Sequence, residues 1–170
     1  GDVYKRQVLT VGSMAIECMD MPIETPYLPQ RVESEITEAI LRDRNHPSIV
    51  QWELFNEIRR PVLANMLKPM SLKARELDPT RLILDESGGW AEGANLYLPY
   101  STKAFKFNDI HNYPGPNINN NKFDGFLTIG KTPEENKRLG LKARTPGRNV
   151  VPNIPSYVSE IGYGSLPDME

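Results

Sequence analysis

The sequence is short of cysteine, of long apolar runs and of net charge. Its 170 residues include one cysteine, Cys18, which cannot form a disulfide within the chain. No apolar run approaches the roughly 20 residues that a transmembrane helix needs, so we predict no membrane partner. A formal net charge of -2 also gives no sign of a nucleic-acid partner.

Phosphate-binding glycine loops are missing as well. Neither GxGxxG nor GxxxxGK[ST] occurs, which argues against a bound nucleotide, and we predict no cofactor. A catalytic thiol would need a nearby base, and the only histidines are His46 and His111, so we expect Cys18 to be structural. No cluster of metal-ligand residues stands out, and we predict no metal site.

Residues 1–7 have an unusual composition for the start of a domain. Back-translated, residues 2–7 can be written with codons that match the end of a transposon adapter used in sequencing libraries. We therefore predict a non-native segment at 1–7 and a natural gene that begins upstream. An ordinary native N-terminus is the alternative, and the codons of the gene decide between the two.

From residue 8 onward, strand-like and helix-like segments alternate, which favours βα units and an α/β fold with a parallel sheet. The end of a helix is expected at 8–11, with Gly12 as its cap, and a loop with one short helix at 133–135 is expected over 112–156. Pro69 is expected to kink or split a helix at 62–77, and another helix should end near Arg44. The predicted strands are 13–17, 49–55, 81–84, 108–111 and 157–160.

Each predicted strand ends in a polar or acidic residue. These residues are Glu17, Glu57, Asp85 with Glu86, His111 and Glu160. The carboxyl ends of parallel strands meet on one face of a (β/α)₈ barrel, and they also form the ligand site of a doubly wound sheet. Two glutamates at such a face suggest glycoside cleavage, which uses a pair of carboxyl groups. Ordinary strand-end carboxylates in salt bridges are the alternative.

Two motifs carry a family resemblance. Residues 42–52, RDRNHPSIVQW, closed by Asn56 and Glu57, resemble the signature of glycoside hydrolase family 2. Residues 159–162, SEIG, resemble the strand of the same family that carries its nucleophile. Weaker similarity extends through 15–22, 78–81 and 111–114. The family includes β-galactosidases, β-glucuronidases and β-mannosidases, and residues 53–55 differ from its best-known members, so the subfamily stays open.

The resemblance implies a TIM barrel that is only partly present. Residues 8–170 would form a partial catalytic domain that runs from about the third barrel strand to the seventh. The other strands, and the β-sandwich domains that usually precede the barrel, would be partners missing from this chain. We expect the 170-residue chain alone to be inactive and prone to aggregate, because its sheet would keep open edges.

The resemblance also implies roles for individual residues in a retaining β-glycosidase that cleaves an oligosaccharide or other glycoside. Glu57 would be the general acid/base and Glu160 the nucleophile. Substrate contacts are expected from Asn56, His111, Tyr113, Glu17, Asp85, Glu86 and Trp90. The alternatives are a non-catalytic carbohydrate-binding barrel and a glycosidase of a related TIM-barrel family.

Overall fold

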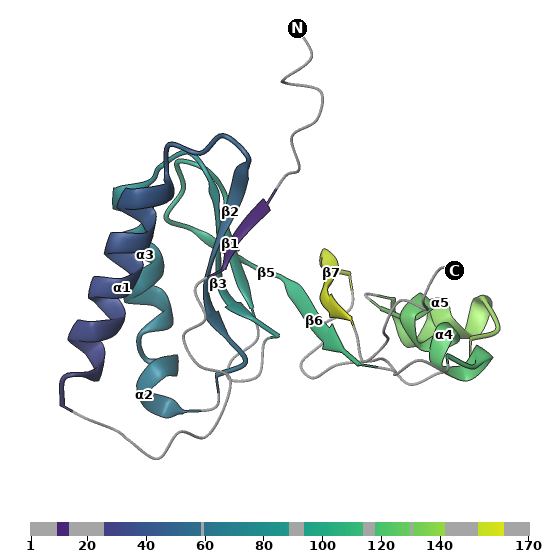
Figure 1. Ribbon diagram of the computed structural model, residues 1–170. Helices are drawn as coiled ribbons and strands as arrows, with labels where there is room; N and C mark the ends of the chain where they lie inside the picture. The colour runs from purple at the N-terminus through teal and green to yellow at the C-terminus, as the bar shows by residue number, and fades with distance from the viewer. Residues whose placement is uncertain are drawn as a thin grey trace, which may run out of the picture.

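Figure 1 shows the computed structural model, in which helices pack on one side of a twisted sheet and a smaller sheet leads to two short helices. The structure describes residues 10–13, 26–58, 60–88, 94–113, 118–129, 131–141 and 153–161. The strands are β1 (Thr10–Ser13), β2 (Ile49–Asn56), β3 (Leu82–Ser87), β4 (Asn95–Tyr97), β5 (Ala104–Lys106), β6 (Asn108–Asn112) and β7 (Ser156–Ile161). The helices are α1 (Leu28–Asp43), α2 (Pro61–Ala64), α3 (Leu67–Leu77), α4 (Asn120–Leu127) and α5 (Pro133–Arg138).

The strands form two sheets. In the larger sheet, β1, β2 and β3 run parallel, and β4 and β5 extend it in antiparallel fashion. In the smaller sheet, β6 and β7 run parallel. Contacts between β3 and β6 connect the two sheets. The carboxyl ends of β2, β3, β6 and β7 can therefore supply side chains to one place.

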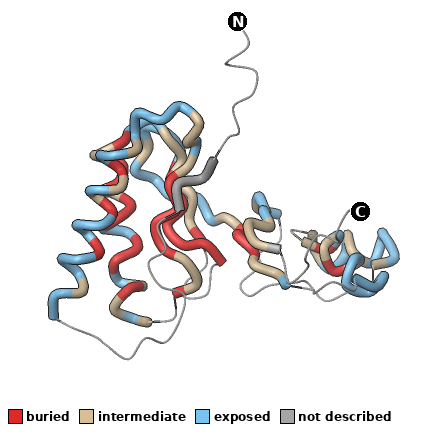
Figure 2. Tube along the Cα trace, in the orientation of Figure 1, coloured by how far each residue is buried: buried red, intermediate tan, exposed pale blue. Residues whose placement is uncertain are grey.

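The core lies between the larger sheet and the helices α1 and α3. Helix α1 buries Val32, Ile36 and Ile40, which are spaced four residues apart and so lie on one face. Strand β2 has a continuous buried run from Trp52 to Phe55, as expected for a strand covered on both sides. Figure 2 shows the buried positions along the facing sides of α1, α3 and the sheet.

Asp78 organises the end of the sheet opposite the strand tips. Its carboxylate accepts hydrogen bonds from Trp52 Nε1 at 2.8 Å, from Arg81 Nη1 at 2.6 Å and from Thr80. Burial disfavours the charged form, but these hydrogen bonds outweigh it and lower the pKa of Asp78 to about 2. Arg81 also donates to the carbonyl of His46. Trp52 and His46 of the 42–52 motif therefore help to stabilise this end of the sheet.

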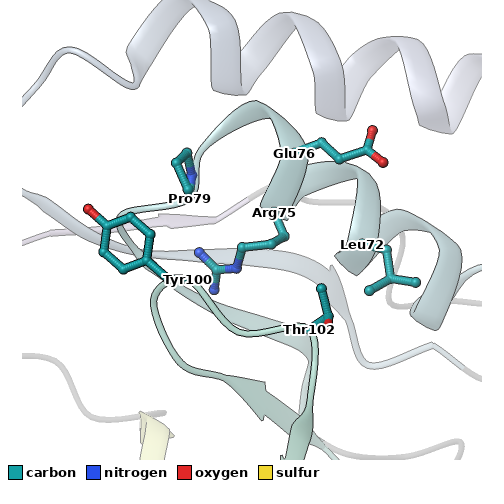
Figure 3. A pocket seen from close by; sticks show the side chains of 6 residues that line it. All are labelled: Leu72, Arg75, Glu76, Pro79, Tyr100 and Thr102. Atoms are coloured by element: carbon teal, nitrogen blue, oxygen red, sulfur yellow. The ribbon is translucent and has the colours of Figure 1, made fainter.

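Arg75 of α3 is buried and stabilises the same end of the sheet as Asp78. Its five N–H groups donate to the backbone carbonyls of Ser101, Asp78, Arg81, Tyr97 and Leu98. Arg75 lines a pocket of about 400 Å³ together with Leu72, Glu76, Pro79, Tyr100 and Thr102. Figure 3 shows its side chain among these residues. Because Arg75 uses all its donors on the backbone, it joins the turn before β3 to the end of β4 and the segment that follows it.

Several expectations about elements are corrected. Residues 10–13 form a strand and not the end of a helix, because they pair in parallel with β2. The expected helix over 62–77 is split into α2 and α3, but the break falls at Asn65 and Met66. Pro69 lies in the first turn of α3, where its missing N–H costs nothing. Residues 14–17 of the first predicted strand lie outside the described residues.

The segments on either side of β6 also differ from expectation. Instead of a purely parallel sheet, β4 and β5 form an antiparallel extension between β3 and β6. Within the loop expected over 112–156, α5 confirms the short helix, whereas α4 was not predicted. Asn119 caps α4 by accepting from the backbone N–H of Lys122. None of the described helices is long and apolar enough to cross a membrane.

Candidate active site

Glu57 and Glu160 approach one another from different strands. Glu57 follows the last residue of β2, and Glu160 lies near the end of β7. Glu57 has a φ of 48°, a left-handed conformation that is uncommon outside glycine and is often found at functional sites. Its backbone N–H donates to the carbonyl of Ser87 at 2.9 Å, which fixes this turn against β3. The side chain of Glu57 is 15% exposed and that of Glu160 is 37% exposed.

His111 of β6 lies between the two glutamates. Its Nδ1 is 2.5 Å from Oε1 of Glu57, and its Nε2 is 3.5 Å from Oε1 of Glu160. The hydroxyl of Tyr113 donates to Oε2 of Glu160. The structure therefore brings four of the predicted site residues together: Glu57, His111, Tyr113 and Glu160. The side chain of His111 is 2% exposed, and it is the buried residue of this group that lies between the two glutamates.

Behind His111 lies a layer of polar groups that were not predicted at the site. Ser87 Oγ is 2.7 Å from Nε2 of His111, and the carboxylate of Asp109 accepts from Ser87, Gly88 and Ser159. The sequence does hold a signal for Asp109. It lies two residues before His111 on β6, and side chains two residues apart in a strand share a face.

An irregularity in the smaller sheet brings Ser159 into this layer. Ile110 pairs with Val158, but His111 pairs with Glu160, so Ser159 is an additional residue on β7. A β-bulge of this kind changes the direction of neighbouring side chains and is common beside active sites. Here Ser159 reaches Asp109 while Glu160 reaches Tyr113.

Gly88 makes room for the pair formed by His111 and Glu57. It has a φ of 81°, which favours glycine. A Cβ at this position would lie 2.9 Å from Nδ1 of His111 and 3.1 Å from Cγ of Glu57. Any larger residue would therefore displace the contact between these two side chains.

The remaining predicted site residues differ in where they lie. Asn56 ends β2 beside Glu57, and its buried Oδ1 has no hydrogen-bond partner in the part of the chain that the structure describes. Glu86 is fully buried within β3. Glu17 and Trp90 lie outside the described residues.

Asp85 is not brought to the glutamate pair. Its carboxylate accepts from the backbone and side-chain amides of Asn95 at 2.7 and 2.6 Å, and from the N–H of Glu86. Burial raises the pKa of Asp85 to about 6, although these hydrogen bonds oppose the shift. It lines a pocket with Lys68 and Lys106 among others. Asp85 was predicted to contact substrate, but its carboxylate lies in this separate environment.

The separation of the glutamates limits the chemistry available to them. Glu57 and Glu160 each offer a carboxylate oxygen, and His111 offers a ring nitrogen. These three possible ligand atoms lie within 4.8 Å of one another. Such a trio can also hold a cation, but the direct contacts of His111 with Glu57 and of Tyr113 with Glu160 account for its arrangement. Two carboxyl groups at this distance can act on one bond, one as proton donor and one as nucleophile.

The similarity of this chain to known proteins lies mainly in residues 8–122. Residues 8–122 match the family model described as "Glycosyl hydrolases family 2, TIM barrel domain". Over 56 residues the chain is 41% identical to a curated protein of Formosa agariphila named "Putative beta-glucuronidase". That stretch is 33% of this chain and 5% of the relative, so the chain matches only a small part of it. No solved structure matches the chain.

Proposed function

The chain belongs to glycosyl hydrolase family 2, and on that basis we propose that it carries the catalytic residues of a retaining β-glycosidase. The supporting observation is the short distance between Glu57 and Glu160, whose facing oxygens lie within 4.8 Å. Retaining glycosidases place their two carboxyl groups about 5–5.5 Å apart, whereas inverting enzymes leave about 6.5–9.5 Å for a water molecule. The geometry therefore favours direct attack by a carboxylate.

In the first step, Glu160 attacks the anomeric carbon of the sugar and forms a covalent glycosyl ester. The bond between that carbon and the leaving-group oxygen breaks, and Glu57 gives its proton to that oxygen. In the second step, Glu57 takes a proton from water, and the water oxygen replaces Glu160 on the anomeric carbon. Each step inverts the anomeric centre, so the product retains the β configuration.

The neighbouring residues support these roles. Tyr113 donates a hydrogen bond to Glu160, which stabilises the charged form that attacks. Asn56 lies beside Glu57 with a buried oxygen that no described residue pairs, and we assign it to the sugar 2-hydroxyl. Glu17, Glu86 and Trp90 remain proposed contacts with more distant parts of the substrate.

We further propose that residues 8–170 are part of a larger barrel. The parallel strands β1, β2, β3, β6 and β7 would be its third to seventh strands, and a closed barrel of this kind has eight. The remaining strands would come from other parts of the same protein, as would any β-sandwich domains. Residues 1–7 are proposed to be non-native. On this view the isolated chain is inactive.

A substrate panel on the complete protein tests the proposal. Aryl β-glucuronides, β-galactosides and β-mannosides would be compared, with the glucuronide first because the matched relative is named for that activity. We expect hydrolysis of at least one aryl β-glycoside, with a β-configured first product in the NMR spectrum. Binding of sugars without hydrolysis would instead indicate a non-catalytic carbohydrate-binding barrel, and an α-configured first product would contradict the retaining mechanism.

A further inference from the structure

We propose that Asp109 is a positioning residue that controls both glutamates of the proposed site, Glu57 through Ser87 and His111, and Glu160 through Ser159. This inference rests on the proposed glycosidase function. It assigns a role to a buried carboxylate that is not one of the two glutamates and does not contact their carboxyl oxygens.

The contacts of Asp109 are concentrated on one oxygen. Its side chain is fully buried, and Oδ1 accepts from Ser159 Oγ at 2.6 Å, Gly88 N at 2.8 Å and Ser87 Oγ at 3.2 Å. These donors come from the end of β3, the residue after it, and β7. A buried carboxylate is costly unless hydrogen bonds compensate it, so its presence here indicates a role that an apolar residue would not fill.

The first branch leads from Asp109 to Glu57. In the arrangement that we infer, the Ser87 hydroxyl gives its one proton to Asp109, and its oxygen accepts from Nε2–H of His111 at 2.7 Å. A neutral His111 protonated at Nε2 presents Nδ1 as an acceptor. One proton is then shared in the 2.5 Å contact between Nδ1 of His111 and Oε1 of Glu57. In this proposal the shared proton is the one that Glu57 gives to the leaving-group oxygen in the first step.

The second branch leads from Asp109 to Glu160. Ser159 immediately precedes Glu160 and is the extra residue of the bulge in β7. Its hydrogen bond to Asp109 holds the bulge against β6. Without this bond, β7 can return to regular pairing, in which successive side chains point to opposite faces. Glu160 would then lose its direction toward the site.

The two branches make different predictions for substrates with different leaving groups. Protonation by Glu57 matters for a phenyl glycoside, whose leaving group is poor, and little for a dinitrophenyl glycoside, which leaves unaided. Nucleophilic attack by Glu160 matters for both. In the complete protein, kcat/KM for each substrate reports the first chemical step, so the ratio of the two values separates the branches.

Three variants would be measured with both substrates. Ser87→Ala should lower kcat/KM about 100-fold for the phenyl glycoside and less than about threefold for the dinitrophenyl glycoside. Ser159→Ala should lower both values by similar factors of about 10 or more. Asp109→Asn should lower both, with the larger loss for the phenyl glycoside. Because Asp109 acts through Ser87, the double variant Asp109→Asn/Ser87→Ala should lose less than the product of the single losses.

Asp78→Asn is the matched control, because Asp78 is a second buried carboxylate at the opposite end of the sheet. It should reduce stability without changing the ratio between the substrates. If Asp109→Asn and Ser87→Ala leave the ratio unchanged while the wild type hydrolyses both substrates, the positioning role is wrong and the glycosidase function stands. If the folded wild type hydrolyses no aryl glycoside, the proposed function is wrong and this inference fails with it.

Discussion

The imidazole Nδ1 of His111 lies 2.5 Å from Oε1 of Glu57, although the two residues are 54 positions apart in the sequence. The contact joins the end of β2 to β6, which belong to different sheets. It holds the proposed acid/base in a fixed direction before any substrate binds. Such preorganisation lowers the cost of aligning the carboxyl group with the bond to be cleaved.

Replacing Gly88 by alanine should disrupt this contact. The new Cβ would meet Nδ1 of His111 at 2.9 Å, and the left-handed backbone adds about 1 kcal/mol of strain. Gly140→Ala is the control, since Gly140 has a φ of 70° and a Cβ added there would meet nothing within 4 Å. Both variants should lose stability from backbone strain in thermal unfolding, and Gly88→Ala should lose more because of the clash with His111. Only Gly88→Ala should lose activity, by about 10-fold or more.

Glu57→Ala should slow hydrolysis of a phenyl glycoside by about 10²–10⁴-fold, because the leaving oxygen is no longer protonated. With a dinitrophenyl glycoside, added azide should restore turnover and yield a β-glycosyl azide. Azide replaces the water that Glu57 would otherwise activate as a base. The wild-type protein under the same conditions is the control. If the product is an α-glycosyl azide, or if azide has no effect, Glu57 is not the acid/base.

Arg75→Met should destabilise the protein by about 3 kcal/mol or more, because it leaves backbone carbonyls without their charged donor. Lys73→Met on the same helix is the control. The Lys73–Glu33 pair is 3.9 Å long and largely exposed, and its loss should cost less than about 1 kcal/mol. Urea unfolding of both variants measures the difference, and equal losses would show that Arg75 does not anchor the turn before β3 to the end of β4.

Asp78 and Asp85 should give stability opposite dependences on pH. The pKa of Asp78 falls from 3.8 to about 2, so its contribution is present above pH 4 and is lost as the pH falls from 4 to 2. The pKa of Asp85 rises from 3.8 to about 6, so the folded state holds this proton more tightly than the unfolded state does. The resulting contribution to the free energy of unfolding is fully present below pH 4 and is lost as the pH rises from 4 to 6.

The two aspartates serve as controls for each other. Unfolding free energies of the complete protein would be measured from about pH 2 to about pH 7, which spans both windows. Asp78→Asn should flatten the slope only in the lower window, and Asp85→Asn only in the upper window. If either variant keeps the wild-type slope in its own window, the corresponding pKa shift is wrong.

The parts of the fold with strong sequence periodicity could be predicted. Helix α1 has apolar residues at four-residue spacing, and β2 is rich in apolar and aromatic residues, so both were located to within a few residues. The strand Thr10–Ser13 was missed because it is short and its identity depends on pairing with β2. Strands β4 and β5 have three residues each, which is too few for a pattern of alternation to be recognised.

The same distinction applies to the site. Glu57, Glu160, His111 and Tyr113 come together as expected, because each follows or ends a recognisable strand. Asp109, Ser87 and Ser159 were not predicted, because their roles depend on contacts between strands and on a bulge that no local pattern encodes. Asp85 was predicted at the site from its position near a strand tip, but its carboxylate turns to Asn95.

Trapping of the covalent intermediate tests the assignment of the two glutamates most directly. A 2-deoxy-2-fluoro glycoside with a dinitrophenyl leaving group slows both steps but the second more, so the glycosyl ester accumulates. Peptide mapping of the complete protein by mass spectrometry would then locate the sugar. We predict a label on Glu160, and none in Glu160→Gln. A label on Glu57, or an unchanged label in the Glu160→Gln variant, would contradict the assignment.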